Sequence, residues 1–273
     1  PSGFLALNTQ NLPASTIDNG ATQFDATLYT GTGAAGLSVT NAGSMQPDLV
    51  WVKRRDTTGN NNLMGSYEAN KFLVSNLTNA EGAVSFSFDA DGFSTNTTNV
   101  NWNASGGSYV GWQWKAGGAA VTNTAGSISS QVSANVSAGF SVVTYTGTGA
   151  NATVGHGLGV APKMMIFKNR SIVTSWRIYH ANSNAIPQNY TLYFNTSAAT
   201  AEAAAWNNTA PTSSLISIGT NNSANTNTYV AYCFAEVAGY SKFGSYVGNG
   251  STDGTFVYLG FRPRFVMIKA SSI

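Results

Sequence analysis

The chain has 273 residues, of which 42% are apolar and 9% are charged, so it is long enough to bury a core and depends on neutral polar side chains for solubility. Thirteen Lys and Arg against eleven Asp and Glu leave a formal net charge of +2, and the absence of a long basic run argues against a nucleic-acid partner. The single cysteine, Cys233, rules out an intrachain disulfide and a zinc site built from cysteines, and no apolar run reaches the roughly 18 residues of a membrane span.

The first residues of the chain come before any strand-like pattern. They contain neither a starting Met nor the basic and apolar stretches of a signal sequence. We therefore expect residues 1–23 to be a linker from a preceding domain, and both ends of the chain to have been cut from a longer protein.

From residue 24 onward the chain is built on a repeat. The sequence YTGTG occurs at residues 29–33 and again at 145–149, and a weaker copy, YVGNG, occurs at 246–250. Each copy is followed by a proline, an apolar run and a lysine six positions after the proline, at residues 47–53, 162–168 and 263–269. Landmarks that recur in one order, with loops of variable length between them, predict a structural unit copied along the chain.

A third landmark closes the first two units, since YVGWQW at residues 109–114 matches YVAYCF at 229–234. The third unit lacks this closing strand and is therefore expected to be incomplete. The predicted divisions are a first β module at 24–115, a connector at 116–138, a second β module at 139–238 and the start of a third at 239–273.

The local patterns are those of β-strands. Short β-branched and aromatic runs are bounded by Gly, Pro, Asn or Asp, and only residues 198–206 (AATAEAAAW) favour a helical turn or two. We predict an all-β fold of tandem antiparallel β-sandwich-like modules. The expected strand at 265–269 is apolar on both faces, so residues 255–270 are predicted to pair with the second module, with a neighbouring copy or with a continuation of the chain.

Four tryptophans divide into two kinds. Alternation along the closing strand predicts that Trp112 and Trp114 are core residues, because side chains two apart share a face. Trp102 and Trp206 stand in Asn-rich stretches, where an exposed indole can stack on a sugar ring while neighbouring amides bind its hydroxyl groups. The carbohydrate-site hypothesis adds the amides of Asn101, Asn103, Asn207 and Asn208. The alternative, favoured because a single loop aromatic is a weak signal, is that these two indoles anchor their loops against the sheet.

No other pattern predicts a catalytic residue, a metal site or a cofactor. Residues 89–92 (DADG) have the opening spacing of some calcium loops but lack the later ligands, so a hairpin turn explains them better. His156 lies in a glycine-rich turn without a recognisable nucleophile beside it. Glu81, Asp89 and Asp91 are the closest approach to the carboxylate pair that a glycosidase needs.

Four stretches of the chain resemble a known group of proteins. They are residues 3–13 (GFLALNTQNLP), 114–121 (WKAGGAAV), 144–171 (TYTGTGANATVGHGLGVAPKMMIFKNRS) and 227–251 (NTYVAYCFAEVAGYSKFGSYVGNGS). The chain is similar to the uncharacterised tandem β modules of bacteriophage and prophage tail-fibre-like structural proteins, of the marine-phage type. The resemblance implies a preceding lectin-like β-sandwich and a third unit that continues to its own closing strand, and it brings no established catalytic residues.

We therefore expect a non-enzymatic structural component of a phage virion, a tail or fibre protein involved in assembly and host-surface attachment. It would be made in the host cytoplasm and act in the extracellular virion as a homo-oligomer, with other copies, other virion proteins and host surface glycans as partners. Nucleic acid, membrane insertion and cofactors are not expected. The alternatives are a carbohydrate-binding adhesin module on a cell surface and, least favoured, a polysaccharide depolymerase.

Overall fold

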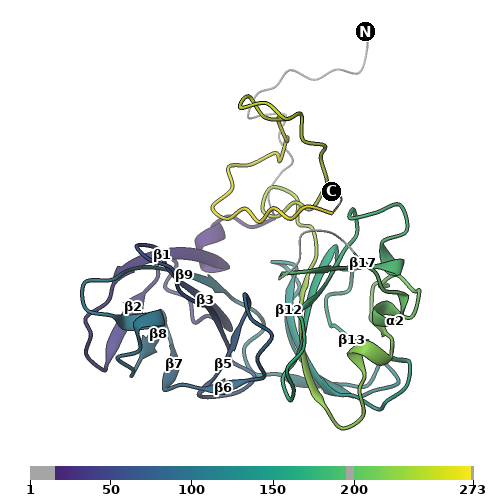
Figure 1. Ribbon diagram of the computed structural model, residues 1–273, viewed down its shortest axis with the longest axis horizontal. Helices are drawn as coiled ribbons and strands as arrows, with labels where there is room; N and C mark the ends of the chain where they lie inside the picture. Colours follow the sequence, from purple (N-terminus) through teal and green to yellow (C-terminus); the bar gives the residue numbers. More distant parts are fainter. Residues whose placement is uncertain (1–15, 195–199, 272–273) are drawn as a thin grey trace.

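The computed structural model describes residues 16–194 and 200–271. Its strands form two large antiparallel sheets, each covered on its outer face by a small sheet (Figure 1). Helices are confined to single turns in the loops, so the predicted all-β fold is confirmed. The chain folds in this way because short runs of alternating apolar and polar residues are separated by glycine and asparagine turns.

The first large sheet and its cover come from residues 24–114. The strand order is β1-β9-β3-β4-β5-β6 in the large sheet and β2-β8-β7 in the cover. The strands are β1 (Phe24–Thr30), β2 (Leu37–Thr40), β3 (Leu49–Arg54), β4 (Asn61–Gly65), β5 (Lys71–Val74), β6 (Gly82–Ala83), β7 (Phe86–Asp89), β8 (Gly92–Thr95) and β9 (Ser108–Trp114), with the turns η2 (Gly20–Thr22) and α1 (Val100–Asn103). The first outer core lies between the two sheets and consists of Val39, Val50, Val52, Met64, Val84, Phe86, Phe93, Trp102 and Tyr109.

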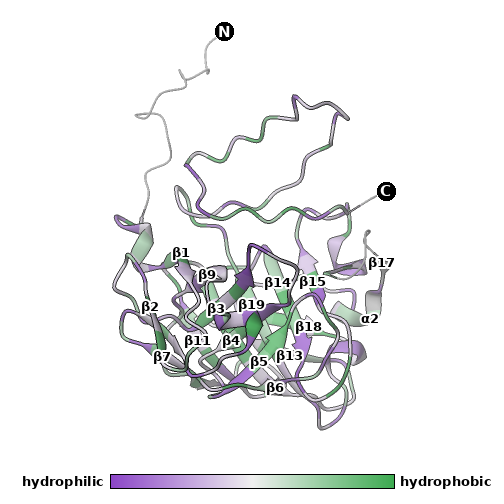
Figure 2. Cartoon of the chain, turned by 60° about the vertical axis from the view of Figure 1, so that its left-hand side comes forward, coloured by the Kyte–Doolittle hydropathy of each residue, from purple (hydrophilic) through white to green (hydrophobic). Residues whose placement is uncertain are grey.

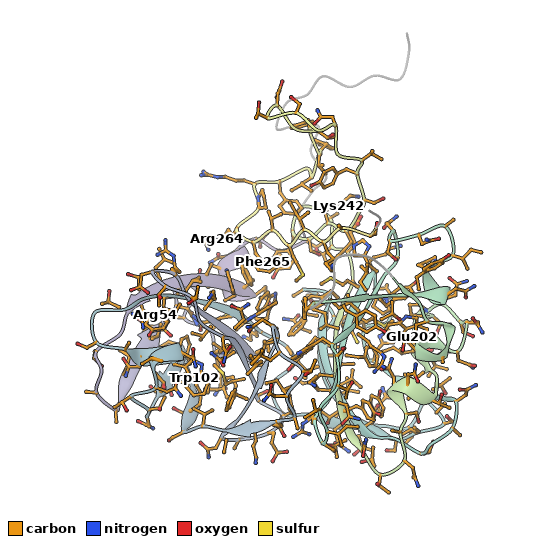
Figure 3. The ribbon with its side chains drawn as sticks, viewed as in Figure 1. Arg54, Trp102, Glu202, Lys242, Arg264 and Phe265 are labelled. Atoms are coloured by element: carbon orange, nitrogen blue, oxygen red, sulfur yellow. The ribbon has the colours of Figure 1, made fainter. Side chains whose placement is uncertain are left out.

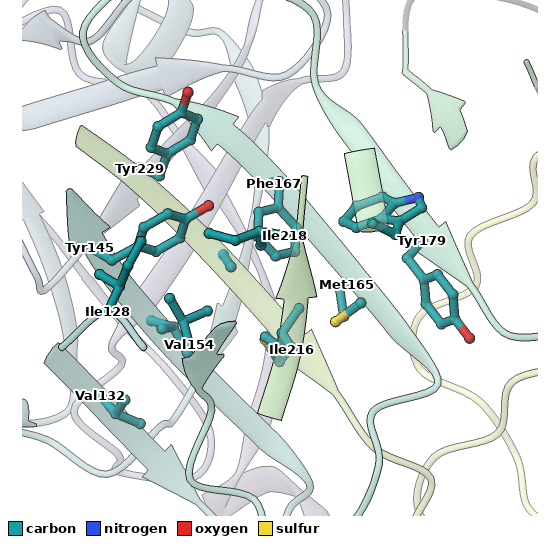
Figure 4. Close-up of a cluster of buried hydrophobic side chains, with 14 of the residues drawn as sticks. Ile128, Val132, Tyr145, Val154, Met165, Phe167, Tyr179, Ile216, Ile218 and Tyr229 are labelled. Atoms are coloured by element: carbon teal, nitrogen blue, oxygen red, sulfur yellow. The ribbon is translucent and has the colours of Figure 1, made fainter. Parts of the chain in front are cut away.

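The second large sheet has the order β10-β11-β12-β19-β14-β15-β16-β17, and β13-β18 covers it. The strands are β10 (Val121–Asn123), β11 (Ser130–Asn135), β12 (Phe140–Thr146), β13 (Ala152–Gly155), β14 (Met164–Asn169), β15 (Arg177–His180), β16 (Tyr190–Tyr193), β17 (Thr200–Ala201), β18 (Leu215–Ile218) and β19 (Thr228–Phe234), with the turns η3 (Pro187–Asn189), α2 (Ala203–Trp206) and η4 (Thr220–Asn222). The second outer core (Figure 4) includes Tyr145, Val154, Met165, Phe167, Tyr179, Trp206, Ile216, Ile218 and Tyr229.

The two large sheets are copies of one arrangement. The order β1-β9-β3-β4-β5-β6 in the first corresponds to β12-β19-β14-β15-β16-β17 in the second. Tyr29 pairs with Tyr109 in the first sheet, and Tyr145 pairs with Tyr229 in the second. The proline-to-lysine strands, β3 and β14, lie on the other side of the closing strand in the same register. The predicted equivalence of the three landmarks is therefore confirmed.

The segment expected to be a connector, residues 116–138, also contributes two strands. β10 and β11 form there, and β11 pairs with the outer edge of β12, with Val132 opposite Val143. Val132 is buried, whereas the residues around it are largely Ser, Ala and Asn. These strands are thus made by pairing with β12 and not by a strong local preference for β structure.

The two large sheets pack against each other through an inter-sheet core. Phe24, Leu49, Leu63, Leu73 and Trp114 come from the first unit, and Phe140, Val142, Ile166, Trp176, Ile178, Leu192, Val230 and Tyr232 come from the second. Apolar (green) strand segments lie in the interior of the molecule in Figure 2, beside hydrophilic ones. Trp114 is buried and Trp112 packs against the same core while partly exposed, so the prediction that this face of the closing strand is core is confirmed.

The expected third strand does not form in the chain itself. Among the described residues, 242–271 contain no strand, so the predicted strand at 265–269 is wrong for this structure. Side chains along this segment nevertheless alternate between inward and outward positions. Phe265 and Met267 pack against the inter-sheet core, whereas Val266 and Ile268 are 61% and 68% exposed. Figure 3 shows Phe265 above the junction of the two units. Residues 255–270 make no strand pairing with the second unit, and pairing with another copy or a continuation stays a prediction.

Candidate functional site

The indole of Trp102 is not an exposed platform. It lies in α1, is 4% exposed and belongs to the first outer core. The ring of Phe72 meets it edge to face, with 5.0 Å between the ring centroids. Both faces are therefore closed to a sugar, and the carbohydrate-site hypothesis is corrected at this residue because the loop folds back onto the sheet.

The amides beside Trp102 are used to hold loops. Asn103 is fully buried, and its Oδ1 accepts hydrogen bonds from the backbone N–H groups of Thr32 (2.7 Å) and Gly33 (3.3 Å). Its Nδ2 donates to Ala34 O at 2.6 Å. Asn101 Oδ1 accepts a hydrogen bond from Asn60 N at 3.2 Å. Asn103 is thus a clamp for the YTGTG loop and is not available to a ligand.

Trp206 is buried as completely in the second unit. Its side chain is 0% exposed, and its Nε1 donates to Tyr190 O at 2.9 Å. The ring packs edge to face against Phe167 and Tyr179. The sugar hypothesis is corrected here also, and the alternative of an anchor for the loop is the one that the burial supports.

The two asparagines after Trp206 shape the turn. Asn207 and Asn208 both have a φ of 50°, a left-handed conformation that asparagine tolerates better than most residues. Asn207 Oδ1 accepts a hydrogen bond from Asn151 Nδ2 at 2.7 Å, whereas Asn208 is exposed. The buried indole of Trp206 cannot supply the stacking platform that the sugar hypothesis required beside these two amides.

Each unit contains a pair of stacked tyrosines, to which the sequence analysis assigned no role beyond marking the repeat. Tyr29 and Tyr109 stack with 5.0 Å between their centroids, and Tyr145 and Tyr229 stack at 5.2 Å. Burial and the neighbouring tyrosine raise the pKa of Tyr29 and that of Tyr145 well above the ordinary value. The signal was available, because both tyrosines of each pair recur at landmark positions while the loops between them vary.

The phenol groups of these pairs hold the segment that precedes the closing strand. Tyr109 Oη donates to Val100 O (2.7 Å) and accepts from Ala104 N (2.8 Å). In the second unit, Tyr229 Oη likewise accepts from Ala224 N at 2.9 Å. The same turn is therefore fixed by the same hydroxyl group in both copies.

The glycines of the YTGTG motif are explained by this packing. A Cβ on Gly31 would lie 2.2 Å from Ala104 O, and one on Gly147 would lie 2.3 Å from Ala224 O. Gly33 and Gly149 take φ values of +71° and +83°, which glycine adopts without strain. The repeated sequence is therefore the signature of a close approach between two loops.

The landmark lysines also serve the fold. Lys53 Nζ donates to Gly59 O (2.8 Å), and Lys168 Nζ donates to Thr174 O (2.6 Å), in each case six residues further along the chain. Lys168 is 1% exposed. Burial and the charge of Arg177 lower its pKa to about 8. Each lysine closes the loop that follows its strand.

Polar contacts join the two units beside the inter-sheet core. The Arg170 guanidinium binds Glu81 at 2.8 Å and Glu68 at 2.9 Å. Trp176 Nε1 donates to Val74 O at 2.9 Å, and this bond also crosses from the second unit to the first. Glu81, which was considered as a glycosidase carboxylate, is therefore held in an ion pair.

A network of ionisable and polar groups surrounds Glu202 on the second unit. Glu202 Oε1 accepts hydrogen bonds from Arg177 Nε at 3.1 Å and from Asn221 Nδ2, and its Oε2 accepts one from Tyr193 Oη. Burial and the Glu202 carboxylate raise the pKa of Tyr193 to about 12. Both carboxylate oxygens have partners, so Glu202, which directly precedes α2, ties β15, β16 and η4 together.

The remaining sequence candidates are structural too. Residues 89–92 form the turn between β7 and β8, with Asp89 paired to Gly92, as the hairpin interpretation predicted. His156 is buried, its Nδ1 accepts a hydrogen bond from Leu158 N, and its Nε2 lies 3.1 Å from Thr212 O. Burial lowers its pKa. Within 16–194 and 200–271, no three His, Cys, Asp or Glu side chains are grouped so as to hold a metal ion.

A cleft of about 250 Å³ opens where the two units meet the connector. Asp48, Tyr67, Gln131 and Ser133 are among its polar lining residues. Asp48 Oδ2 accepts a hydrogen bond from Ala116 N at 2.7 Å, and its Oδ1 accepts one from the Ser66 hydroxyl at 2.9 Å. The carboxylate thus holds the start of the connector and has its acceptor oxygens engaged.

A family model described as a domain of unknown function, DUF7483, matches residues 19–273. The chain belongs to the DUF7483 family. The DUF7483 match includes both large sheets, their covers and the described C-terminal segment. No curated protein and no solved structure matches the chain. Within the described part of this DUF7483 domain, no helix is long and apolar enough to cross a membrane.

Proposed function

We propose that the protein is a non-enzymatic structural component of a bacteriophage virion, belonging to its tail or fibre. The observation that carries the proposal is that the repeated landmarks of the first two units are used to build the fold. The tyrosines, glycines and lysines of the repeat hold equivalent turns in both units, as described above. Repetition of a structural unit along a chain is typical of proteins with a structural or binding role. The resemblance to tail-fibre-like modules supports the assignment of that role to a phage tail or fibre.

The way in which the units are joined supports the same proposal. An inter-sheet core with residues from both large sheets, the Arg170 ion pairs and the Trp176 hydrogen bond to Val74 connect them. We expect the two units to unfold together, because separating them would expose this core to water. A double unit of fixed geometry suits a fibre or tail segment that must keep its form.

The surface chemistry is compatible with a role at a host surface. Only 9% of the residues are charged, and the loops are rich in Asn, Thr, Ser and Gly. Neutral polar loops can approach anionic or neutral cell-surface glycans without strong electrostatic repulsion. The proposed partners are other virion proteins, further copies of the chain and host glycans, and the proposed location is the extracellular virion after synthesis in the host cytoplasm.

Immunogold electron microscopy tests the proposal. Antibodies raised against the purified chain are applied to particles from lysed cells that carry the gene, with particles from a strain lacking the gene as the control. Gold on tails or fibres of the first particles alone is the expected result. Gold on the cell envelope and none on particles would contradict the proposal and support a cell-surface adhesin.

A further inference from the structure

The first large sheet ends in β1, and no strand of the described residues 16–194 and 200–271 pairs with its outer edge. Its equivalent in the second sheet, β12, is paired on that edge by β11, with Val142 opposite Ser133 and Thr144 opposite Gln131. Among the residues that the structure describes, β1 pairs only with β9. β1 therefore forms the margin of the first unit in Figure 1. The position that β11 fills beside β12 is therefore not filled beside β1 by any strand of the described residues.

The hydrogen-bonding pattern between β1 and β9 identifies which backbone groups of β1 face its outer edge. Just beyond the strand, Gly31 N donates to Gly107 O at 2.8 Å, so the odd-numbered residues bond to β9. In an antiparallel ladder the alternate residues direct their N–H and C=O groups to the opposite side. Ala26, Leu28 and Thr30 therefore point these groups to the outer edge.

β1 also lacks the features that protect most edge strands. It has 7 residues, whereas β6, β10 and β17 at the other edges of the large sheets have 2, 3 and 2. It contains neither Lys nor Pro, and its single charged residue, Asp25, is 3% exposed and bound to Arg264. Leu28 is 61% exposed. A long edge without an exposed charge or a bulge is a surface on which another strand can pair.

We propose that β1 pairs with β1 of a second copy of this chain, antiparallel about a two-fold axis at Leu28. Leu28 then lies opposite Leu28 of the second copy, and Ala26 lies opposite Thr30. Each of these pairs exchanges two backbone hydrogen bonds. The two first sheets become one continuous sheet, and the two Leu28 side chains, which share a face with Phe24 and the inter-sheet core, shield each other from water.

The sequence and symmetry of β1 favour a second β1 as the strand that pairs with this edge. A two-fold pairing uses the same edge of both copies, so the assembly closes and leaves no edge for further addition. In this register Asp25 lies opposite Gly31 of the second copy, so no like charges meet. β11 demonstrates that the position accepts a strand of small polar residues, and β1 itself offers Ala26, Thr27 and Thr30 around Leu28. Such a dimer would form in solution whether or not the protein belongs to a virion.

Sedimentation and cross-linking test this dimer. Sedimentation equilibrium of the chain should give twice its mass of 28.5 kDa, and Leu28→Lys should return it to the monomer mass because two ammonium groups would face each other at the axis. Val121→Lys is the matched control, since Val121 is 66% exposed on the edge strand β10, and it should remain a dimer. Circular dichroism melts establish that each variant is folded.

Cross-linking with a short bismaleimide gives a second measurement. Leu28→Cys should cross-link to a covalent dimer, whereas Val121→Cys should not. Cys233 does not compete, because it is 0% exposed and burial raises the pKa of its thiol to about 12. A monomeric parent chain, a dimer that survives Leu28→Lys, or equal cross-linking at both positions would each overturn the proposal. If Leu28→Lys fails to fold, the cross-linking result decides alone.

Discussion

Replacing Trp206 with alanine should lower the free energy of unfolding by about 3 to 5 kcal/mol, the range for removing a large aromatic from a packed core. The indole is fully buried between Phe167 and Tyr179, so the substitution leaves a cavity lined by aromatic rings. The Trp102→Ala variant should lose a similar amount, because that ring is 4% exposed. Urea denaturation followed by far-ultraviolet circular dichroism measures both.

Substitution with phenylalanine separates packing from hydrogen bonding. Trp206→Phe removes the bond from Nε1 to the partly buried carbonyl group of Tyr190, at a cost of about 1 kcal/mol beyond the lost volume. Trp102 Nε1 has no hydrogen-bond partner within the described residues, so Trp102→Phe should cost only the volume term. If the alanine variants keep the parent stability and lose binding to glycans, the indoles are exposed recognition groups and the reasoning is refuted.

Three other perturbations are measured in the same assay. Arg170→Ala should lower the free energy of unfolding by about 3 kcal/mol, because it leaves the Glu81 carboxylate unpaired at a site where both side chains are about one-tenth exposed. Removal of Arg54 from its more exposed ion pair with Asp56 is the control. Equal effects of the two substitutions would contradict the argument. Gly147→Ala should cost more than about 1 kcal/mol because of its contact with a carbonyl oxygen, whereas Gly244→Ala, which meets no atom, should not. Burial lowers the pKa of His156 in the folded state, so unfolding takes up a proton and stability should fall as the pH drops below about 6.5. His156→Gln should reduce that pH slope, and an unchanged slope would show that another group is responsible.

The repeat made much of the fold predictable. Landmarks such as Tyr29 and Tyr145 mark equivalent strands because the same backbone contacts require the same side chains in each copy. The alternation around Trp114 correctly predicted a buried face, since side chains two apart share one side of a strand.

Features that depend on distant partners were not predictable. Val132 and its neighbours form β11 only because the edge of β12 lies beside them. Residues 265–269 have the pattern of β3 and β14 but lack a closing strand in the described chain, so they direct Phe265 inward without forming a ladder. The Asn-rich setting of Trp102 and Trp206 resembled an exposed loop, whereas both turns fold over the outer face of a large sheet and bury the indoles.

Cryo-electron microscopy of purified particles tests the central claim most directly. The account predicts density in the tail or fibre into which the two packed large sheets and their covers fit as one body, with the Trp102 and Trp206 side chains enclosed. Particles with fully interpreted tails and fibres that contain no such double unit, although the gene is expressed in the infected cells, would contradict a structural role in the virion.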